Sequence, residues 1–182
     1  MPLAPRSLAA LALALALLAG CGGDRESRAP AREAPKIAVP DRAVARRCTR
    51  VVDGDTVILD GNERVRLIGV DTPEMDREGA PAQYFAREAK AHLRRLVEDR
   101  PVKLAFDYAR RDRYGRTLGY LFLEDGTFVN LEIVRQGYGF AYTRFPFRWL
   151  EEFRSAEKTA RREGAGLWSE PDSITARRGP PA

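Results

Sequence analysis

Three aspartates and an arginine interrupt an apolar, β-branched stretch that spans residues 51–74. Asp53 and Asp55 flank a glycine, and Asp71 follows a second apolar run. Arg66 lies between two apolar residues of that run. Charged side chains inside a strand-forming segment are costly unless each one meets an opposite charge or a metal ion. The pattern therefore indicates either an ordinary strand with solvated charges or a site built from these charges.

The aspartates offer only hard oxygen ligands, which calcium, magnesium and manganese prefer. Zinc and copper prefer His or Cys, and the chain has a single histidine, His92, together with Cys21 and Cys48. Zinc hydrolysis, Ser-His-Asp catalysis and histidine-based nuclease chemistry therefore lack their parts. His92 lies beside Leu93 in an amphipathic helical pattern, which favours an ordinary helix position for it.

Two arginines and a glutamate complete a set of residues that could act on a phosphodiester. Arg66 shares a strand face with Ile68 and Val70, so its side chain is expected at a semi-buried surface. Arg116 begins an apolar strand. Two guanidinium groups held by strands can grip a phosphate bidentately, and Glu74 could activate water. Together with carboxylates for a metal, these residues are the parts of a phosphodiesterase.

Alternation and turn signals predict strands, and a helical period predicts helices, along the middle of the chain. The predicted strands cover residues 47–52, 55–59, 63–70, 102–106 and 116–123. The predicted helices cover residues 85–96, a short segment capped by Asn130 that ends near Gly137, and residues 149–160 with a stop at Gly164. Strands clustered early, with helices among and after them, predict an α+β domain built on a small barrel.

Residues 1–20 have the features of an export signal. Arg6 supplies a positive start, residues 8–18 form a run rich in Ala and Leu, and small residues lead to Cys21. This junction resembles a bacterial lipoprotein signal, which predicts lipidation of Cys21 and an exported protein anchored on the periplasmic or outer side of a membrane. A plain secretory peptide with an incidental cysteine is the alternative.

Composition divides the rest of the chain into three parts. Residues 21–45 predict a flexible tether, residues 46–171 a folded domain, and residues 172–182 a disordered tail. If Cys21 is lipidated, Cys48 has no partner for an internal disulfide, and a packed strand residue is favoured over a regulatory or intermolecular thiol. The formal net charge of +5 suits polyanions, nucleic acid and lipid headgroups among them, without choosing between them.

Several long motifs occur in the order found in staphylococcal-type thermonucleases: VVDGDTV, VRLIGVDTPE, RDRYGRTLGYLF, EIVRQG and GLWSE. The chain resembles this family over residues 46–170, which is nearly the whole predicted domain. The resemblance implies an OB-type five-stranded barrel with three helices. It also favours the interpretation that the charges form a site.

The resemblance implies roles for the acidic residues. Asp55 and Asp71 match the direct ligands of one calcium ion, and the carbonyl of Thr72 completes the protein ligands. Asp53 matches a nearby outer-shell carboxylate, and Glu74 matches the residue proposed as the general base.

The remaining matches concern the substrate. Arg66 and Arg116 match the pair that grips the phosphate. Arg113 and Tyr114 fall near the terminal phosphate of the bound nucleotide, with an arginine in place of the family's lysine. Tyr142 is the best match to a base-stacking tyrosine, and a second such tyrosine has no clear counterpart.

The leading hypothesis is a calcium-dependent nuclease, a membrane-anchored monomer that hydrolyses DNA and RNA, with single strands favoured. One alternative is a catalytically inactive OB module that binds single-stranded nucleic acid. A decayed enzyme would be expected to lose Glu74, an arginine or a metal carboxylate, and all are present. Another alternative is a structural lipoprotein whose basic surface contacts anionic headgroups, which leaves the paired carboxylates unexplained.

Replacing Cys21 tests the anchor. We expect Cys21→Ser to leave the membrane fraction or to stay unprocessed, because the acyl chains attached at this residue would hold the protein on the bilayer. Fractionation of cells and the mass of the purified protein measure both outcomes. Cys48→Ser is the matched control and should fractionate like wild type. If Cys21→Ser is processed normally and stays fully in the membrane fraction, the prediction of a lipid anchor at Cys21 is wrong.

Overall fold

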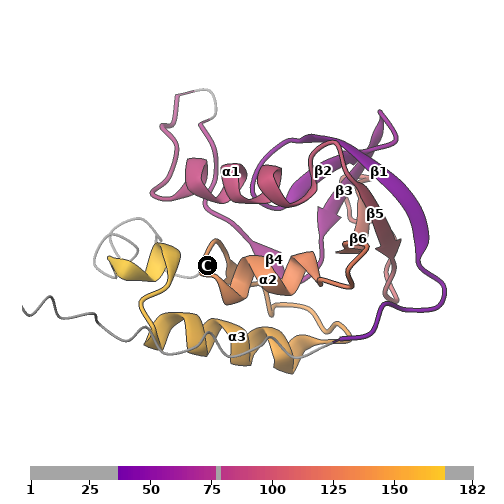
Figure 1. Cartoon of the computed structure of the whole chain (residues 1–182). Helices are drawn as coiled ribbons and strands as arrows, with labels where there is room; N and C mark the ends of the chain where they lie inside the picture. The colour runs from indigo at the N-terminus through magenta and orange to yellow at the C-terminus, as the bar shows by residue number, and fades with distance from the viewer. Residues whose placement is uncertain (1–36, 77–78, 171–182) are drawn as a thin grey trace, which may run out of the picture. The chain divides into compact units, whose positions relative to one another are not determined.

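A closed barrel of five strands forms the core of the domain, which the computed structural model describes over residues 37–76 and 79–170. The order around the barrel is β1-β2-β3-β6-β5, and the helices lie to one side of it (Figure 1). This architecture confirms the predicted OB-type α+β fold. The barrel strands are β1 (Val44–Val51), β2 (Thr56–Leu59), β3 (Glu63–Leu67), β5 (Pro101–Ala105) and β6 (Thr117–Phe122).

All neighbouring barrel strands are antiparallel except one pair. β3 runs parallel to β6, with Arg66 opposite Leu118, and this pairing closes the barrel between the early and late strands. Along β2 and β3 the side chains alternate, as a strand requires. Val57 and Val65 are fully buried inside the barrel, whereas Arg66 and its neighbours two residues away face outward.

Three α-helices pack beside the barrel near the positions that the helical period predicts. α1 contacts β1 and α2, and α2 also contacts β6 and α3. In the part of the chain that the structure describes, none of these helices is long and apolar enough to cross a bilayer. The helices are α1 (Ala86–Val97), α2 (Val129–Arg135), α3 (Leu150–Arg162) and the 3-10 turn η1 (Gly166–Ser169).

The predicted continuous strand over residues 63–70 is wrong in one respect. β3 ends at Leu67, and the chain turns at Gly69, whose φ of +79° is a left-handed conformation that glycine adopts without strain. A Cβ at Gly69 would lie 2.8 Å from the ring of Phe153. The short strand β4 (Val70–Asp71) then pairs with β7 (Phe140–Ala141) outside the barrel. This break sends Asp71 back toward Arg66.

Asn130 was expected to cap α2, and this prediction is also wrong. The helix begins after Phe128, and Asn130 lies fully buried inside its first turn. Its side chain accepts a hydrogen bond from the Leu121 backbone N–H at 2.9 Å and donates to the carbonyls of Ile68 at 2.9 Å and Gly119 at 3.1 Å. Because these backbone groups are buried, they need a partner, and Asn130 supplies it. It thereby joins α2 to the end of β3 and to the middle of β6.

The folded domain begins earlier than the predicted boundary at residue 46. β1 starts at Val44, and Ile37 and Val39 pack against the core, so residues 37–45 belong to the folded domain and not to the predicted tether. The other residues for which a tether was predicted, the predicted signal segment with Cys21 and the predicted tail of residues 172–182 lie outside the described residues.

The two residues with reactive side chains that were expected to be structural are buried. Cys48 is fully buried in β1, and burial raises the pKa of its thiol to about 11. His92 stacks on Tyr138 with ring centroids 3.8 Å apart, and burial lowers the pKa of its imidazole to about 4. Both are therefore uncharged packing residues at neutral pH.

Candidate active site

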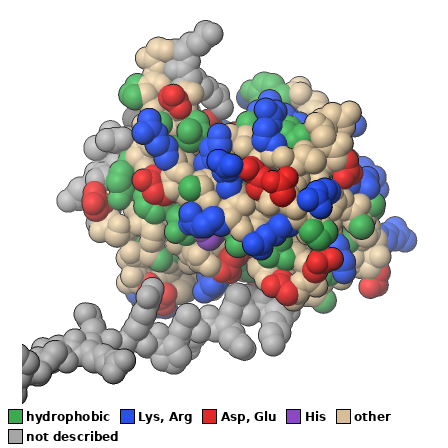
Figure 2. Space-filling model, turned by 45° about the horizontal axis from the view of Figure 1, so that its top comes forward, with side chains coloured by type: hydrophobic (Ala, Val, Ile, Leu, Met, Phe, Trp, Pro, Cys, Tyr) green, Lys and Arg blue, Asp and Glu red, His purple; other side chains and the backbone are tan. Residues whose placement is uncertain are grey.

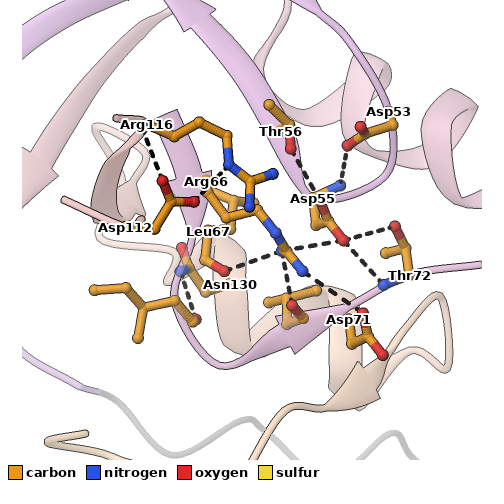
Figure 3. A network of polar contacts seen from close by, with 12 residues as sticks. Asp53, Asp55, Thr56, Arg66, Leu67, Asp71, Thr72, Asp112, Arg116 and Asn130 are labelled. Atoms are coloured by element: carbon orange, nitrogen blue, oxygen red, sulfur yellow. Dashed lines mark hydrogen bonds and ion pairs between the residues drawn. The ribbon is translucent and has the colours of Figure 1, made fainter. Parts of the chain in front are cut away.

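Asp55 is the centre of a network of polar contacts (Figure 3). It directly precedes β2, and only 7% of the residue is exposed. Its Oδ2 accepts hydrogen bonds from the Thr72 N–H and the Thr72 hydroxyl, both at 3.0 Å, and its Oδ1 accepts one from the Thr56 hydroxyl at 3.0 Å. The carboxylate therefore ties β2 to the chain that follows β4.

Burial raises the pKa of the Asp55 carboxyl to about 7, although Arg66 opposes this effect and Asp53 adds to it. Asp53 accepts a hydrogen bond from the Asp55 N–H at 3.1 Å, which closes the turn before β2. Gly54 between them lies against Thr72, where a Cβ would come within 2.7 Å of the hydroxyl. The glycine of the Asp-Gly-Asp sequence thus allows Thr72 to pack closely beside Asp55.

Arg66 neutralises Asp55 from the neighbouring strand. Its Nη1 lies 3.0 Å from Asp55 Oδ2 and donates to the Val70 carbonyl at 2.7 Å, and its Nη2 lies 3.6 Å from Asp71 Oδ1. With 16% of its side chain exposed, Arg66 is semi-buried, as its position in the strand pattern predicted. The break at Gly69 makes this possible, because it places the Val70 carbonyl and Asp71 where the guanidinium can reach both.

Arg116 lies on the same outer face of the barrel as Arg66. Leu118 is opposite Arg66, and Arg116 precedes Leu118 by two residues, so strand alternation places both arginines on one face. Figure 3 shows the two guanidinium groups beside each other. The structure therefore brings together the arginine pair that the sequence predicted from separate strands.

Asp112 fixes Arg116, and the sequence analysis missed it. Its Oδ2 accepts a hydrogen bond from Arg116 Nε at 2.6 Å, and its Oδ1 accepts from the backbone N–H groups of Tyr114 at 2.9 Å and Arg116 at 3.0 Å. Burial raises the pKa of Asp112, but the bonds from Arg116 outweigh it and hold the pKa below its ordinary value. An aspartate three residues before the turn glycine Gly115 is the signal that could have identified this role.

Exposed aromatic side chains occur before and after Arg116 in the sequence. Tyr114 is 68% exposed, and the guanidinium of Arg113 lies 4.8 Å from its ring centroid and that of Arg116 5.6 Å from it. Tyr142 follows β7, donates its N–H to the Gly69 carbonyl at 2.9 Å and is 36% exposed. Its ring lies 6.1 Å from that of Phe145, which is 63% exposed. Phe145 was not among the predicted site residues.

Glu74 lies three residues beyond Asp71, in the connection between β4 and α1. Its backbone is held on both sides by Gln83: the Glu74 N–H donates to the Gln83 side chain at 2.9 Å, and the Gln83 N–H donates to the Glu74 carbonyl at 2.9 Å. The Glu74 residue is exposed. Two hydrogen bonds with Gln83 thus hold the backbone of the predicted general base, which is close in sequence to Asp71.

Two carboxylates converge on one cationic group. Asp55 and Asp71 both approach the guanidinium of Arg66, so their charges already stabilise a cation between them. Among residues 37–76 and 79–170, no three His, Cys, Asp or Glu side chains form a metal cluster. A hard cation would therefore take these two carboxylates, a backbone oxygen such as that of Thr72, and water, which is an all-oxygen set that fits calcium.

Basic side chains are numerous on one face of the domain. Lys and Arg side chains spread over the face seen in Figure 2 and surround a smaller group of Asp and Glu. The formal net charge of +5 has the same sign. Such a surface attracts a polyanion at long range.

The family model described as staphylococcal nuclease homologue matches residues 64–170 of the chain. The chain belongs to this family. It is 36% identical to a thermonuclease of Staphylococcus hyicus over 124 residues, which is 66% of this chain and 73% of that protein. It is 38% identical to a thermonuclease of Staphylococcus intermedius over 125 residues, which is 65% of this chain and 73% of that protein. It is also 34% identical to the endonuclease YncB of Bacillus subtilis over 134 residues, or 70% and 63% of the two chains.

For this member of the staphylococcal nuclease family, Asp112 should act as a positioning residue for Arg116. We expect Asp112→Ala to lower kcat for single-stranded DNA by about 10- to 100-fold, because a guanidinium displaced by about 1 Å stabilises the transition state poorly. Asp112→Asn should lose less, since its amide oxygen can still accept the two backbone hydrogen bonds.

A double-mutant cycle with Arg116→Gln separates positioning from folding. If Asp112 acts through Arg116, Asp112→Ala should have almost no further effect in the Arg116→Gln background. Asp125→Ala removes a similar bond, which Asp125 Oδ1 accepts from the Thr127 N–H at 2.9 Å, and is the matched control. Equal and additive losses in both backgrounds would contradict a positioning role.

Proposed function

We propose that the chain is a calcium-dependent nuclease that hydrolyses the phosphodiester bonds of DNA and RNA. The observation that carries this proposal is the placement of Arg66 and Arg116 side by side on the outer face of the barrel, next to the carboxylates of Asp55 and Asp71. This arrangement offers positive charge to a phosphate and oxygen ligands to a metal at one place. The thermonuclease and endonuclease relatives support a nucleic-acid-hydrolysing enzyme.

One calcium ion is the proposed cofactor, held by Asp55, Asp71 and the Thr72 carbonyl, with Asp53 outside the ligand set. When bound, it would supply a positive charge that polarises the phosphate and offsets the negative charge of the carboxylates. Calcium is favoured over softer metals because the residues at this place offer oxygen alone. Asp55 and Asp71 place two carboxylates at this site, and a bound cation would share with Arg66 the task of offsetting their charge.

The residues of the chain divide the hydrolysis between them. Glu74 accepts a proton from water, and the water oxygen forms a bond to phosphorus while the bond from phosphorus to the leaving oxygen breaks. The leaving oxygen keeps the electron pair of that bond and takes a proton from solvent. Arg66 and Arg116 donate hydrogen bonds to the phosphate oxygens, on which negative charge accumulates as the pentacoordinate phosphorus forms. The semi-buried position of Arg66 strengthens this interaction, because less water screens it there.

Single strands are the favoured substrates of this proposal. Tyr114 and Tyr142 are exposed aromatic residues, and bases can stack on such side chains only when they are unpaired. Arg113 adds a cation beside Tyr114, with a hydrogen bond of 2.6 Å between the two side chains. The chain is proposed to act as a monomer that is exported and anchored through Cys21, on the basis of the sequence of residues 1–21.

The inactive binding module remains a weaker candidate. Its barrel and aromatic residues would be the same, but it gives no reason for two carboxylates to converge on Arg66 or for Asp112 to hold Arg116. Incubation with single-stranded DNA in calcium or in a chelator distinguishes the two. Cleavage in calcium alone supports the enzyme, and binding without cleavage in both conditions supports the module.

The calcium proposal predicts a specific effect at Asp71. Asp71→Asn removes one anionic oxygen from a hard-cation site, so the calcium concentration for half-maximal activity should rise by about tenfold or more, and excess calcium should restore part of the rate. Activity titrated with calcium measures both. The exposed Asp41→Asn carries the same change away from the site and is the control. An unchanged calcium dependence of Asp71→Asn would exclude this residue as a ligand.

The catalytic roles predict different outcomes for Glu74 and Arg66. Glu74→Gln should lower kcat by about 100-fold or more, because an amide cannot accept the proton from water. It should leave binding almost unchanged, since binding depends on the basic groups. Arg66→Lys should also lower kcat, because lysine keeps the charge but loses the two-pronged contact with phosphate oxygens.

Turnover in calcium and equilibrium binding in chelator should be measured for both variants on the same oligonucleotide. Glu124→Gln, an exposed glutamate beyond β6, is the control for the amide substitution. Thermal unfolding shows whether Arg66→Lys still folds, because Arg66 also pairs with Asp55. If Glu74→Gln is fully active, Glu74 is not the general base. If Arg66→Lys is fully active, Arg66 has only a structural role.

A further inference from the structure

A row of arginines crosses the outer face of the barrel beyond the proposed site. The strand registers place Arg50 of β1 opposite Ile58 of β2, and Ile58 opposite Arg64 of β3. Continuing the parallel register of β3 and β6 by one residue places Arg116 beside Arg64. The row therefore runs Arg50, Ile58, Arg64 and Arg116 across four neighbouring strands.

This row is continuous with Arg66. Arg64 and Arg66 lie two residues apart on β3, with the fully buried Val65 between them, so both side chains leave the same outer face about 7 Å apart. Arg50 lies two strand spacings from Arg64, or about 10 Å. The face that carries the proposed phosphate grip thus continues outward over β2 to β1.

Arg50 and Arg64 differ from the arginines of the site in their partners. Both are exposed, and neither forms an ion pair with any of the described residues. The acids of the β2–β3 hairpin are occupied elsewhere: Asp60 and Glu63 lie 3.2 and 3.5 Å from Arg46. The row therefore has a positive charge that the surrounding side chains do not balance.

Like charges on neighbouring strands are unfavourable without a compensating group. Arg64 and Arg116 are such neighbours, and Asp112 compensates Arg116 alone. Ile58 between Arg50 and Arg64 is apolar and only 9% exposed, so it adds no charge to the row. An anion that extends along the row would relieve the repulsion at every position.

We propose that Arg64 and Arg50 form a second binding track for the phosphodiester backbone of a single-stranded nucleic acid. The strand would pass from the phosphate held by Arg66 and Arg116, over Arg64 and Ile58, to Arg50. This inference rests on the proposed nuclease function and extends it: the enzyme prefers strands long enough to place further phosphates on the track. The face of the second and third strands is also where OB barrels bind oligonucleotides.

A polynucleotide fits the row better than a lipid surface does. A membrane would contact a broad patch, whereas the row is a line that begins at the arginine pair of the site. Its cations are arginines, whose planar groups suit bidentate contacts with phosphate oxygens. A chain with regularly spaced phosphates can occupy all of these positions at once.

The test compares two double variants that lose the same charge. Arg50→Gln/Arg64→Gln removes the track, and Arg154→Gln/Lys158→Gln removes two exposed cations of α3. On an oligonucleotide of about 16 nucleotides, the track variant should have a KM about tenfold above that of the α3 variant, with a similar kcat. On a dinucleotide, which is too short to reach from Arg66 to Arg50, the two variants should behave alike.

Salt dependence gives a second readout. For the long oligonucleotide in chelator, the slope of log binding constant against log salt should fall by about 1.4 in the track variant relative to wild type, because two phosphate contacts are lost. A thermal unfolding midpoint equal to that of wild type confirms that each double variant folds.

The outcomes separate the track from the nuclease. Hydrolysis of both substrates by wild type, with equal KM values for the two double variants on the long strand, overturns the track alone. Equal KM values with weaker binding of the track variant to phosphatidylglycerol vesicles assign the row to lipid and also overturn it. If wild type hydrolyses neither substrate in calcium, the nuclease fails and the track fails with it.

Discussion

The burial of the Asp55 carboxyl group is the constraint on which the site depends. A carboxylate with 7% exposure needs hydrogen bonds and a nearby cation, and the chain supplies them from three places: Thr56 in β2, Arg66 in β3, and Thr72 after β4. These contacts fix the relative positions of the strands that carry the charged residues. The same residue that could hold a metal therefore also organises the protein around it.

Support from outside the barrel keeps this arrangement rigid. Asn130 in α2 satisfies buried backbone groups at Ile68 and Gly119, next to the strands that present Arg66 and Arg116. Asp112 accepts a hydrogen bond from the Arg116 guanidinium just before β6 and so holds this side chain in place. The arginines are held from both sides, which reduces the reorganisation needed when a phosphate arrives.

Much of the fold and the site could be predicted from the sequence, because short-range patterns encode them. Alternation identified the barrel strands, and the charges in an apolar run identified Asp55, Arg66 and Asp71 as residues that need partners. The break at Gly69 was missed, because the apolar pattern continues through it, whereas its left-handed φ and its contact with Phe153 exist only in the folded chain. The role of Asn130 was missed for a related reason: a helix cap is a local pattern, whereas its real partners are distant in sequence.

The parallel pairing of β3 with β6 has a consequence for when the site exists. Parallel strands cannot be joined by a tight turn, and here the connection contains α1 and β5. Contacts between residues so far apart in the chain form late in folding, because closing the long loop costs entropy first. Arg66 and Arg116 therefore meet only once the barrel has closed. A chain that is still being synthesised and lacks β6 has no assembled pair of arginines, so it cannot yet hold a phosphate between them.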